Sequence, residues 1–143
     1  MAGPRGLAAG VFLLMLTLVI SGCGASVLEL DVGQCFDDPP DFAEVAGVEV
    51  VPCASPHHNE VIAVLDITDS PYPGDAEMAR IAESRCRAAF AGYVGVAYDD
   101  SPLALGWLAP SADSWVVGDR QVICFVFDQS GDRTSGSVRG VSA

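Results

Sequence analysis

The hydrophobic pattern of the chain begins with an apolar run that carries no charge. The run covers residues 7–20, and Arg5 is the only charged residue before Glu29. At 1.5 Å per residue, a helix of this length spans roughly 21 Å, whereas a bilayer core is about 30 Å thick. The run is therefore short for a permanent membrane span and is typical of the apolar part of a secretory signal.

Later apolar segments are short and have the pattern of β-strands. Strands are predicted at residues 28–32, 48–51, 61–67, 103–108, 114–117 and 121–127, with a possible edge strand at 137–140. Residues 61–67 and 121–127 are apolar on both faces, which indicates central strands. The Gly118-Asp119 pair fits a tight hairpin turn between the last two strands.

One helix is predicted between these strands. Asp75 is placed to cap its first turn, and Gly92 or Gly95 is a usual stop. Apolar residues recur at spacings of three and four, as on one face of a helix. These residues are Met78, Ile81, Ala82, Cys86, Ala89, Phe90 and Tyr93.

Together these elements predict an α+β fold. We expect a mostly antiparallel sheet of about five short strands, with the main helix packed on one face. Because two strands are apolar on both sides, the other face of the sheet must also be partly covered.

The end of the apolar run carries the strongest motif. Ile20-Ser21-Gly22-Cys23 resembles the lipobox of bacterial lipoproteins, in which the peptidase cuts before the cysteine and the thiol carries a diacylglycerol group. The resemblance implies a signal peptide at residues 1–22, a tether at 23–29 and a single domain at 30–143, with a partly flexible tail from about residue 130. It places the protein on the extracytoplasmic face of the cell membrane, held by several acyl chains. An ordinary cleavable signal, or an uncleaved anchor reaching about Leu30, is the alternative.

Charge narrows the range of partners. The chain has 19 acidic residues, 7 basic ones and a formal net charge of −12. Cleavage after residue 22 would remove only one of these charged residues, Arg5. Such a negative surface argues against nucleic acid as a partner. The absence of lysine, with abundant Ala, Gly and Val, suggests a GC-rich, actinobacterial genome.

The number of cysteines supports an extracytoplasmic location. With Cys23 assigned to the lipobox, an even set remains: Cys35, Cys53, Cys86 and Cys124. Outside the cytoplasm this predicts two disulfides, for which three connectivities are possible. We favour Cys35–Cys53, which closes a short loop, and Cys86–Cys124, which ties the helix to a strand. Because no CxxC pair exists, a zinc site is disfavoured and no metal or other cofactor is predicted.

Two clusters are candidates for binding. His57 and Glu60, with the neighbouring His58, offer metal-ligand chemistry, but adjacent histidines on a strand point to opposite faces. The structural interpretation is that His57 bonds loop backbone while His58 is solvated.

The second cluster is Trp115, Asp119 and Arg120. Its two charged groups could bind a ligand beside the indole, but a hairpin with Trp115 packed on the core is the favoured interpretation.

Catalytic motifs are weak. The acidic pairs Asp37-Asp38 and Asp99-Asp100 lie in loop-like stretches and are predicted to be solvated. The sequence contains no Gly-x-Ser-x-Gly elbow, and the cysteines are better explained as bridges. We therefore predict a protein that is not an enzyme.

Several short motifs occur in a specific order along the chain. They are Val32-Gly33-Gln34-Cys35-Phe36, Val51-Pro52-Cys53, Pro56-His57, Glu60-Val61, Cys86, Pro110-Ser111, Trp115, Gly118-Asp119-Arg120, Cys124 and Gly136-Ser137. This order resembles the actinobacterial septum formation family of small extracytoplasmic proteins. The resemblance implies an envelope-associated domain with paired cysteines and a link to cell division, and it implies no known catalytic activity.

The leading hypothesis is a lipid-anchored interaction module that binds an envelope or divisome protein. The first alternative is a metal-dependent or hydrolytic enzyme centred on His57 and Glu60. The second is a solute-binding lipoprotein, which would require a deep apolar pocket.

Overall fold

A computed structural model describes residues 25–26, 29–39, 47–68 and 71–141. The predicted signal peptide and the lipobox, including Cys23, lie outside the described residues. Within the described ranges, no helix is both long and apolar enough to cross a membrane.

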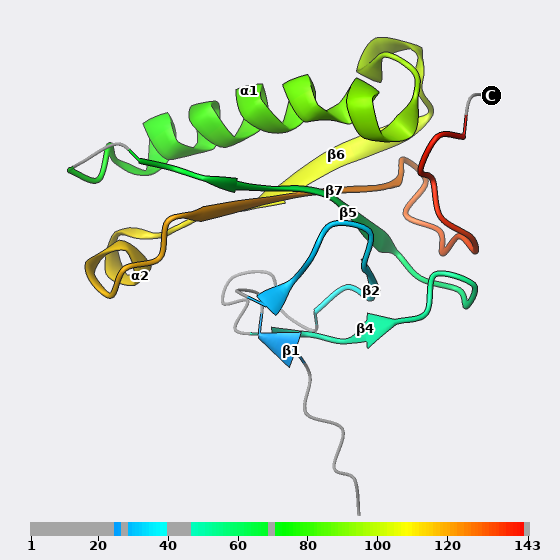
Figure 1. Cartoon of the computed structure of the whole chain (residues 1–143), viewed down its shortest axis with the longest axis horizontal. Coiled ribbons are helices and arrows are strands. Elements are labelled where there is room, and N and C mark those ends of the chain that lie inside the picture. The colour runs from blue at the N-terminus through cyan, green and yellow to red at the C-terminus, as the bar shows by residue number, and fades with distance from the viewer. Residues whose placement is uncertain (1–24, 27–28, 40–46, 69–70, 142–143) are drawn as a thin grey trace, which may run out of the picture.

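The main structure is a five-stranded antiparallel sheet with one long helix on one face (Figure 1). From edge to edge, its strands are β4 (Val50–Val51), β2 (Cys35–Phe36), β5 (Asn59–Asp66), β7 (Gln121–Asp128) and β6 (Leu103–Leu108). A separate pair joins β1 (Ala25–Ser26) to β3 (Gly47–Val48). The remaining elements are α1 (Asp75–Val94), η2 (Tyr98–Asp100) and α2 (Ala112–Val116). The predicted α+β fold is confirmed.

The two predicted central strands are central, and both of their faces are covered. β5 and β7 pair along almost their whole length. On one face, α1 covers a cluster that includes Ile62, Val122 and Phe90. On the other face, a second cluster gathers Leu30, Phe36, Val48, Val61, Ile123 and Phe125. The N-terminal segments therefore supply the second cover that the double-sided strands require.

The long helix buries the predicted apolar stripe. Met78, Ala82, Cys86, Phe90, Tyr93 and Val94 are its buried residues. Gly95, with a φ of 94°, ends the helix in the left-handed region as predicted. The prediction that Asp75 caps the helix is wrong, because Gly74 holds the cap position and Asp75 is the first helical residue.

Both predicted disulfides are present. Cys35 and Cys53 have their Cα atoms 5.2 Å apart, and Cys86 and Cys124 are 5.3 Å apart. The first bridge lies beside the start of β5, and the second joins α1 to β7.

The predicted strand at 114–117 and its hairpin are wrong. These residues form most of α2, which begins with a reciprocal cap: the Ser111 hydroxyl accepts from the Ser114 backbone N–H, and the Ser114 hydroxyl accepts from the Ser111 N–H. Two helix-capping serines three positions apart outweigh the strand preference of a short apolar run. Gly118, with a φ of 99°, follows the end of this helix rather than opening a hairpin.

Three other strand predictions need correction. Residues 29–32, the described part of the predicted strand at 28–32, are not in a strand. The Gln34 N–H donates to the Asp31 carbonyl and closes a turn, and β2 begins only at Cys35. Residues 48–51 are divided between β3 and β4. Residues 137–140 form no strand; instead, Ser137 and Val138 bond the side chain of Glu60.

Position 106 of β6 must be a glycine because an aromatic side chain lies against it. It pairs with Phe125 of β7, and a Cβ atom at Gly106 would overlap the Phe125 ring. Phe36 stands edge-on behind that ring, with 5.4 Å between the centroids. Gly106→Ala is therefore expected to lower the free energy of unfolding by about 1–3 kcal/mol, measured by denaturant titration.

The matched control for Gly106 is Gly92, an exposed position of α1 at which an added Cβ atom would meet no neighbouring side chain. Gly92→Ala is expected to raise stability by up to about 1 kcal/mol through helix propensity. Equal effects at the two positions would contradict the packing argument.

Candidate functional site

The start of β5 brings the first candidate cluster together. Cys35 of β2 lies opposite Glu60 in the strand pairing, and its sulfur is bonded to Cys53. His57 and Glu60 are both buried, at 1% and 2% exposure. The sequence therefore correctly grouped these two side chains, but they lie inside the domain and not on its surface.

Glu60 is held by three donors from distant parts of the chain. The Tyr93 hydroxyl of α1 donates to Oε1 at 2.6 Å, and the Ser137 hydroxyl donates to the same oxygen at 2.6 Å. The Val138 backbone N–H donates to Oε2 at 2.8 Å. The carboxylate thus joins the centre of the sheet, the helix and the C-terminal segment.

Tyr93 is adapted to this contact. Burial, followed by its hydrogen bond to Glu60, raises the pKa of the Tyr93 hydroxyl, while the nearby Arg139 acts in the opposite direction. The Arg139 guanidinium lies 4.5 Å from the centre of the Tyr93 ring. The phenol therefore stays protonated and remains a donor to the carboxylate at neutral pH.

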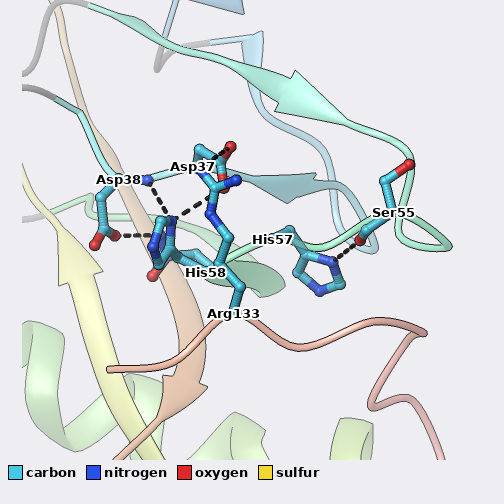
Figure 2. A network of polar contacts seen from close by, with 7 residues as sticks. Asp37, Asp38, Ser55, His57, His58 and Arg133 are labelled. Atoms are coloured by element: carbon cyan, nitrogen blue, oxygen red, sulfur yellow. Dashed lines mark hydrogen bonds and ion pairs between the residues drawn. The ribbon is translucent and has the colours of Figure 1, made fainter. Parts of the chain in front are cut away.

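His57 is fixed by backbone on two sides. Its Nδ1 lies 2.9 Å from the Ser55 carbonyl oxygen, and because a carbonyl only accepts, Nδ1 carries the proton (Figure 2). Its own backbone exchanges two hydrogen bonds with Thr134, each of 2.9 Å. This matches the structural interpretation of His57, which bonds loop backbone.

The C-terminal segment is attached by the same cluster. Besides the contacts of Thr134, Ser137 and Val138, the Gly136 N–H donates to the Cys53 carbonyl and the Gly140 N–H to the Tyr93 carbonyl. The flexibility predicted from about residue 130 stays a prediction.

His58 belongs to a separate, half-exposed network. Its Nδ1 lies 3.0 Å from Asp37 Oδ1, and Arg133 donates to Asp37 Oδ2 at 2.9 Å (Figure 2). The neighbouring Asn59 amide donates to Asp38 Oδ1 at 2.7 Å. The prediction of a solvated His58 is therefore wrong, and that of a solvated acidic pair is wrong for Asp37, because these side chains join the loop after β2 to the start of β5 and, through Arg133, to the C-terminal segment. Asp38 lies in the loop and is exposed, as predicted.

The second candidate cluster is used for packing. The Arg120 guanidinium lies 3.7 Å from the centre of the Trp115 ring and donates to the backbone carbonyls of Trp115 and Asp119, both at 2.7 Å. The Asp119 carboxylate accepts from the Gln121 N–H at 3.1 Å. Trp115 is 7% exposed, so it packs on the core as predicted, although from α2 and not from a hairpin.

A surface pocket lies beside this cluster. It has a volume of about 410 Å³ and is open to solvent, and Asp66, Ser114, Val117, Gly118, Asp119, Arg120 and Gln121 line it. Val117, which lines it, and the preceding Val116 are each 85% exposed. This is not the deep apolar pocket that a solute-binding protein needs.

Tyr72 gives this end of the molecule a measurable pH response. Its hydroxyl donates to Asp75 Oδ1 at 2.6 Å, and that hydrogen bond, with burial and the carboxylate charge, raises the pKa of Tyr72 to about 12. The contact is therefore complete below the ordinary pKa of 10.0 and is lost as the pH rises through about 12. Asp75→Ala is expected to shift one tyrosine titration towards pH 10, measured as phenolate absorbance after rapid pH jumps. An unchanged titration curve would contradict the assignment.

Sequence reasoning missed most partners of the candidate residues. Tyr93, Ser137 and Val138 bond Glu60 across 33, 77 and 78 positions. The Gly136-Ser137 motif and the possible edge strand at 137–140 marked this region in advance, but neither indicated that it contacts Glu60.

The chain resembles known proteins over most of its length. It matches the family described as "Septum formation" over residues 29–141. It is also 32% identical over 117 residues to "Putative lipoprotein LppN" of Mycobacterium tuberculosis (strain ATCC 25618 / H37Rv), and equally to the protein of that name in Mycobacterium bovis (strain ATCC BAA-935 / AF2122/97). The alignment covers 78% of this chain and 63% of each relative, so the chain spans less than two thirds of their length.

No solved structure matches the chain. The range matched by the family nevertheless contains both disulfides and both candidate clusters. The chain therefore belongs to the septum formation family.

Proposed function

We propose that this protein is a lipid-anchored, extracytoplasmic interaction module of the cell envelope that acts in septum formation. Three observations support it: the family match, the lipoprotein name of the relatives, and the lipobox that ends at Cys23. The proposed partner is an envelope or divisome protein.

The strongest structural support for this proposal is the position of β1. β1 begins at Ala25, only two residues after Cys23, and it pairs with β3. Two residues of extended chain reach at most about 7 Å. A lipid on Cys23 would therefore hold the β1–β3 side of the domain close to the membrane surface.

In this orientation α1 faces away from the membrane and is accessible to a partner protein. In Figure 1, α1 and β1 lie on opposite sides of the sheet. The side chains of Arg80, Glu83 and Arg87 on α1 are exposed. The surface that faces away from the membrane is thus a charged helix face that a second envelope protein can reach.

The burial of the chemical groups supports a non-enzymatic role. Glu60 is almost fully buried and is bonded by groups of the same chain, and the His57 ring is bonded to Ser55. Neither side chain is among those that line the described surface pocket beside Arg120.

The anchor is tested by Cys23→Ser. We expect the variant to leave the membrane fraction for the soluble or secreted fraction, because the only acyl attachment site is lost. The control is Cys53→Ser, which removes a different cysteine and should stay with the membrane. Retention of the Cys23→Ser protein on membranes would contradict the lipid anchor.

The partner is tested by photocrosslinking in intact cells. A crosslinking residue at Glu83, on exposed α1, is expected to capture division proteins, and a fluorescent fusion is expected to concentrate at septa. The same crosslinker at Glu49, between β3 and β4, is the matched control and should capture few proteins. Even labelling around the cell with no capture at Glu83 would reject the septal role.

A further inference from the structure

One buried cluster combines three kinds of metal-binding donor. The sulfur of Cys35, a ring nitrogen of His57 and a carboxylate oxygen of Glu60 all lie within 4.8 Å of one another. All three residues are buried. The Cys53 sulfur is bonded to that of Cys35 at 2.01 Å, so a further donor adjoins this group.

In the oxidised chain this group is not a metal site, because a disulfide sulfur is not a thiolate. Reduction changes the donor set. An external dithiol that attacks the Cys53 sulfur would release Cys35 as a thiolate, and the second thiol of the dithiol would then displace Cys53. The dithiol is oxidised to a disulfide, while the bridge takes up two electrons and two protons. Cys53 is the accessible end for this attack, since it is only half-buried, whereas Cys35 is 0% exposed.

The remaining donors are already oriented for a metal. The His57 Nδ1–H is committed to the Ser55 carbonyl, so the lone pair of the neutral ring is on Nε2. A backbone carbonyl is a usual outer partner of a metal-binding histidine. The Glu60 carboxylate is held by Tyr93, Ser137 and the Val138 N–H, as the carboxylate ligands of metals generally are.

We propose that the reduced form of the Cys35–Cys53 pair binds one Zn²⁺, with His57 and Glu60 as the other two ligands. Two thiolates, one imidazole and one carboxylate suit tetrahedral zinc. Bonds of about 2.0–2.3 Å place such donors about 3.3–3.8 Å apart. The donors of Cys35, His57 and Glu60 therefore need to approach one another only slightly, while the two sulfurs must separate from their bonded distance of 2.01 Å after reduction. Zinc binding releases the two thiol protons. The bridge therefore acts as a redox gate, because oxidation closes the site and reduction opens it.

The site would also preserve the fold. Cys35, His57 and Glu60 lie in β2, the loop before β5 and β5 itself, and the disulfide links the first two of these segments when oxidised. Zinc would restore that connection in a chain whose bridge has not yet formed or has been reduced. This inference does not depend on the proposed envelope function, and its test uses purified protein alone.

The experiment uses the chain with Cys23→Ser, so that only the four bridge cysteines remain. After reduction without oxygen, Zn²⁺ is added and dialysed, and bound zinc is counted by mass spectrometry of the metal. We expect one zinc per reduced chain and none per oxidised chain. Alkylation followed by peptide mapping should show Cys35 and Cys53 protected by zinc, while Cys86 and Cys124 react.

The histidine pair provides a matched control. His57→Gln is expected to weaken zinc binding by about 100-fold or more, since a ligand contributes at least as much as its outer partners. His58→Gln, one residue away in the Asp37 network, should bind zinc like the parent. Circular dichroism of each reduced chain, with and without zinc, shows whether the metal restores structure.

A reduced chain that unfolds and regains structure with zinc, dependent on His57, would support the site equally. The absence of bound zinc, or the same loss in both histidine variants, would overturn it. So would protection of Cys86 and Cys124 in place of Cys35 and Cys53.

Discussion

Replacing Cys86 and Cys124 together by alanine is expected to lower the free energy of unfolding by about 4 kcal/mol. The bridge joins residues 38 positions apart, and closing a loop of that length removes substantial entropy from the unfolded chain. Both cysteines are 0% exposed in the cluster between α1 and the sheet, so the variant also loses buried contacts.

The other bridge is the internal comparison for this prediction. Cys35 and Cys53 are 18 positions apart, so the same argument gives about 3 kcal/mol for their replacement. Denaturant titration of both double variants, without reductant, measures the two values. A larger loss for the shorter loop would show that contacts at Cys35, rather than loop entropy, determine the order.

Elements with a long, regular pattern could be predicted from the sequence. The stripe of α1 repeats over five turns, so its buried face and its glycine end followed from spacing alone. The two central strands were recognisable because both of their faces are apolar. The helical position of Cys86 then indicated an inward bridge to a strand.

Short elements could not be predicted in this way. Residues 112–116 form one short helix, in which strand-like valines and helix-capping serines compete, and the reciprocal hydrogen bonds of Ser111 and Ser114 determine the outcome. Likewise, the possible edge strand at residues 137–140 does not form, because Ser137 and Val138 bond the Glu60 carboxylate instead. In such segments tertiary contacts outweigh local preference.

The candidate site was predictable in its members but not in its partners. His57 and Glu60 were chosen by residue type, and the structure places both in one buried cluster. Arg133 meets Asp37 across 96 positions. No local pattern encodes a contact of that range, because the topology of the sheet and the course of the C-terminal segment create it.

Glu60 is expected to be the most sensitive single residue of the domain. Glu60→Ala should lower the free energy of unfolding by about 4 kcal/mol, because it leaves buried donors without an acceptor and opens a cavity. Glu60→Gln should cost about 2 kcal/mol, since its amide retains one acceptor but places an N–H against a donor. Glu83→Gln on exposed α1 is the matched control and should change stability by less than about 0.5 kcal/mol.

A local readout separates attachment of the C-terminal segment from global stability. The Val138 N–H donates to Glu60 Oε2, and the Gly140 N–H donates to the Tyr93 carbonyl. In Glu60→Gln, hydrogen exchange at Val138 is expected to accelerate far more than exchange in the centre of β7, because the segment can detach while the sheet stays folded. Equal acceleration at both places would mean that Glu60 supports the whole domain and does not specifically attach its C-terminal segment.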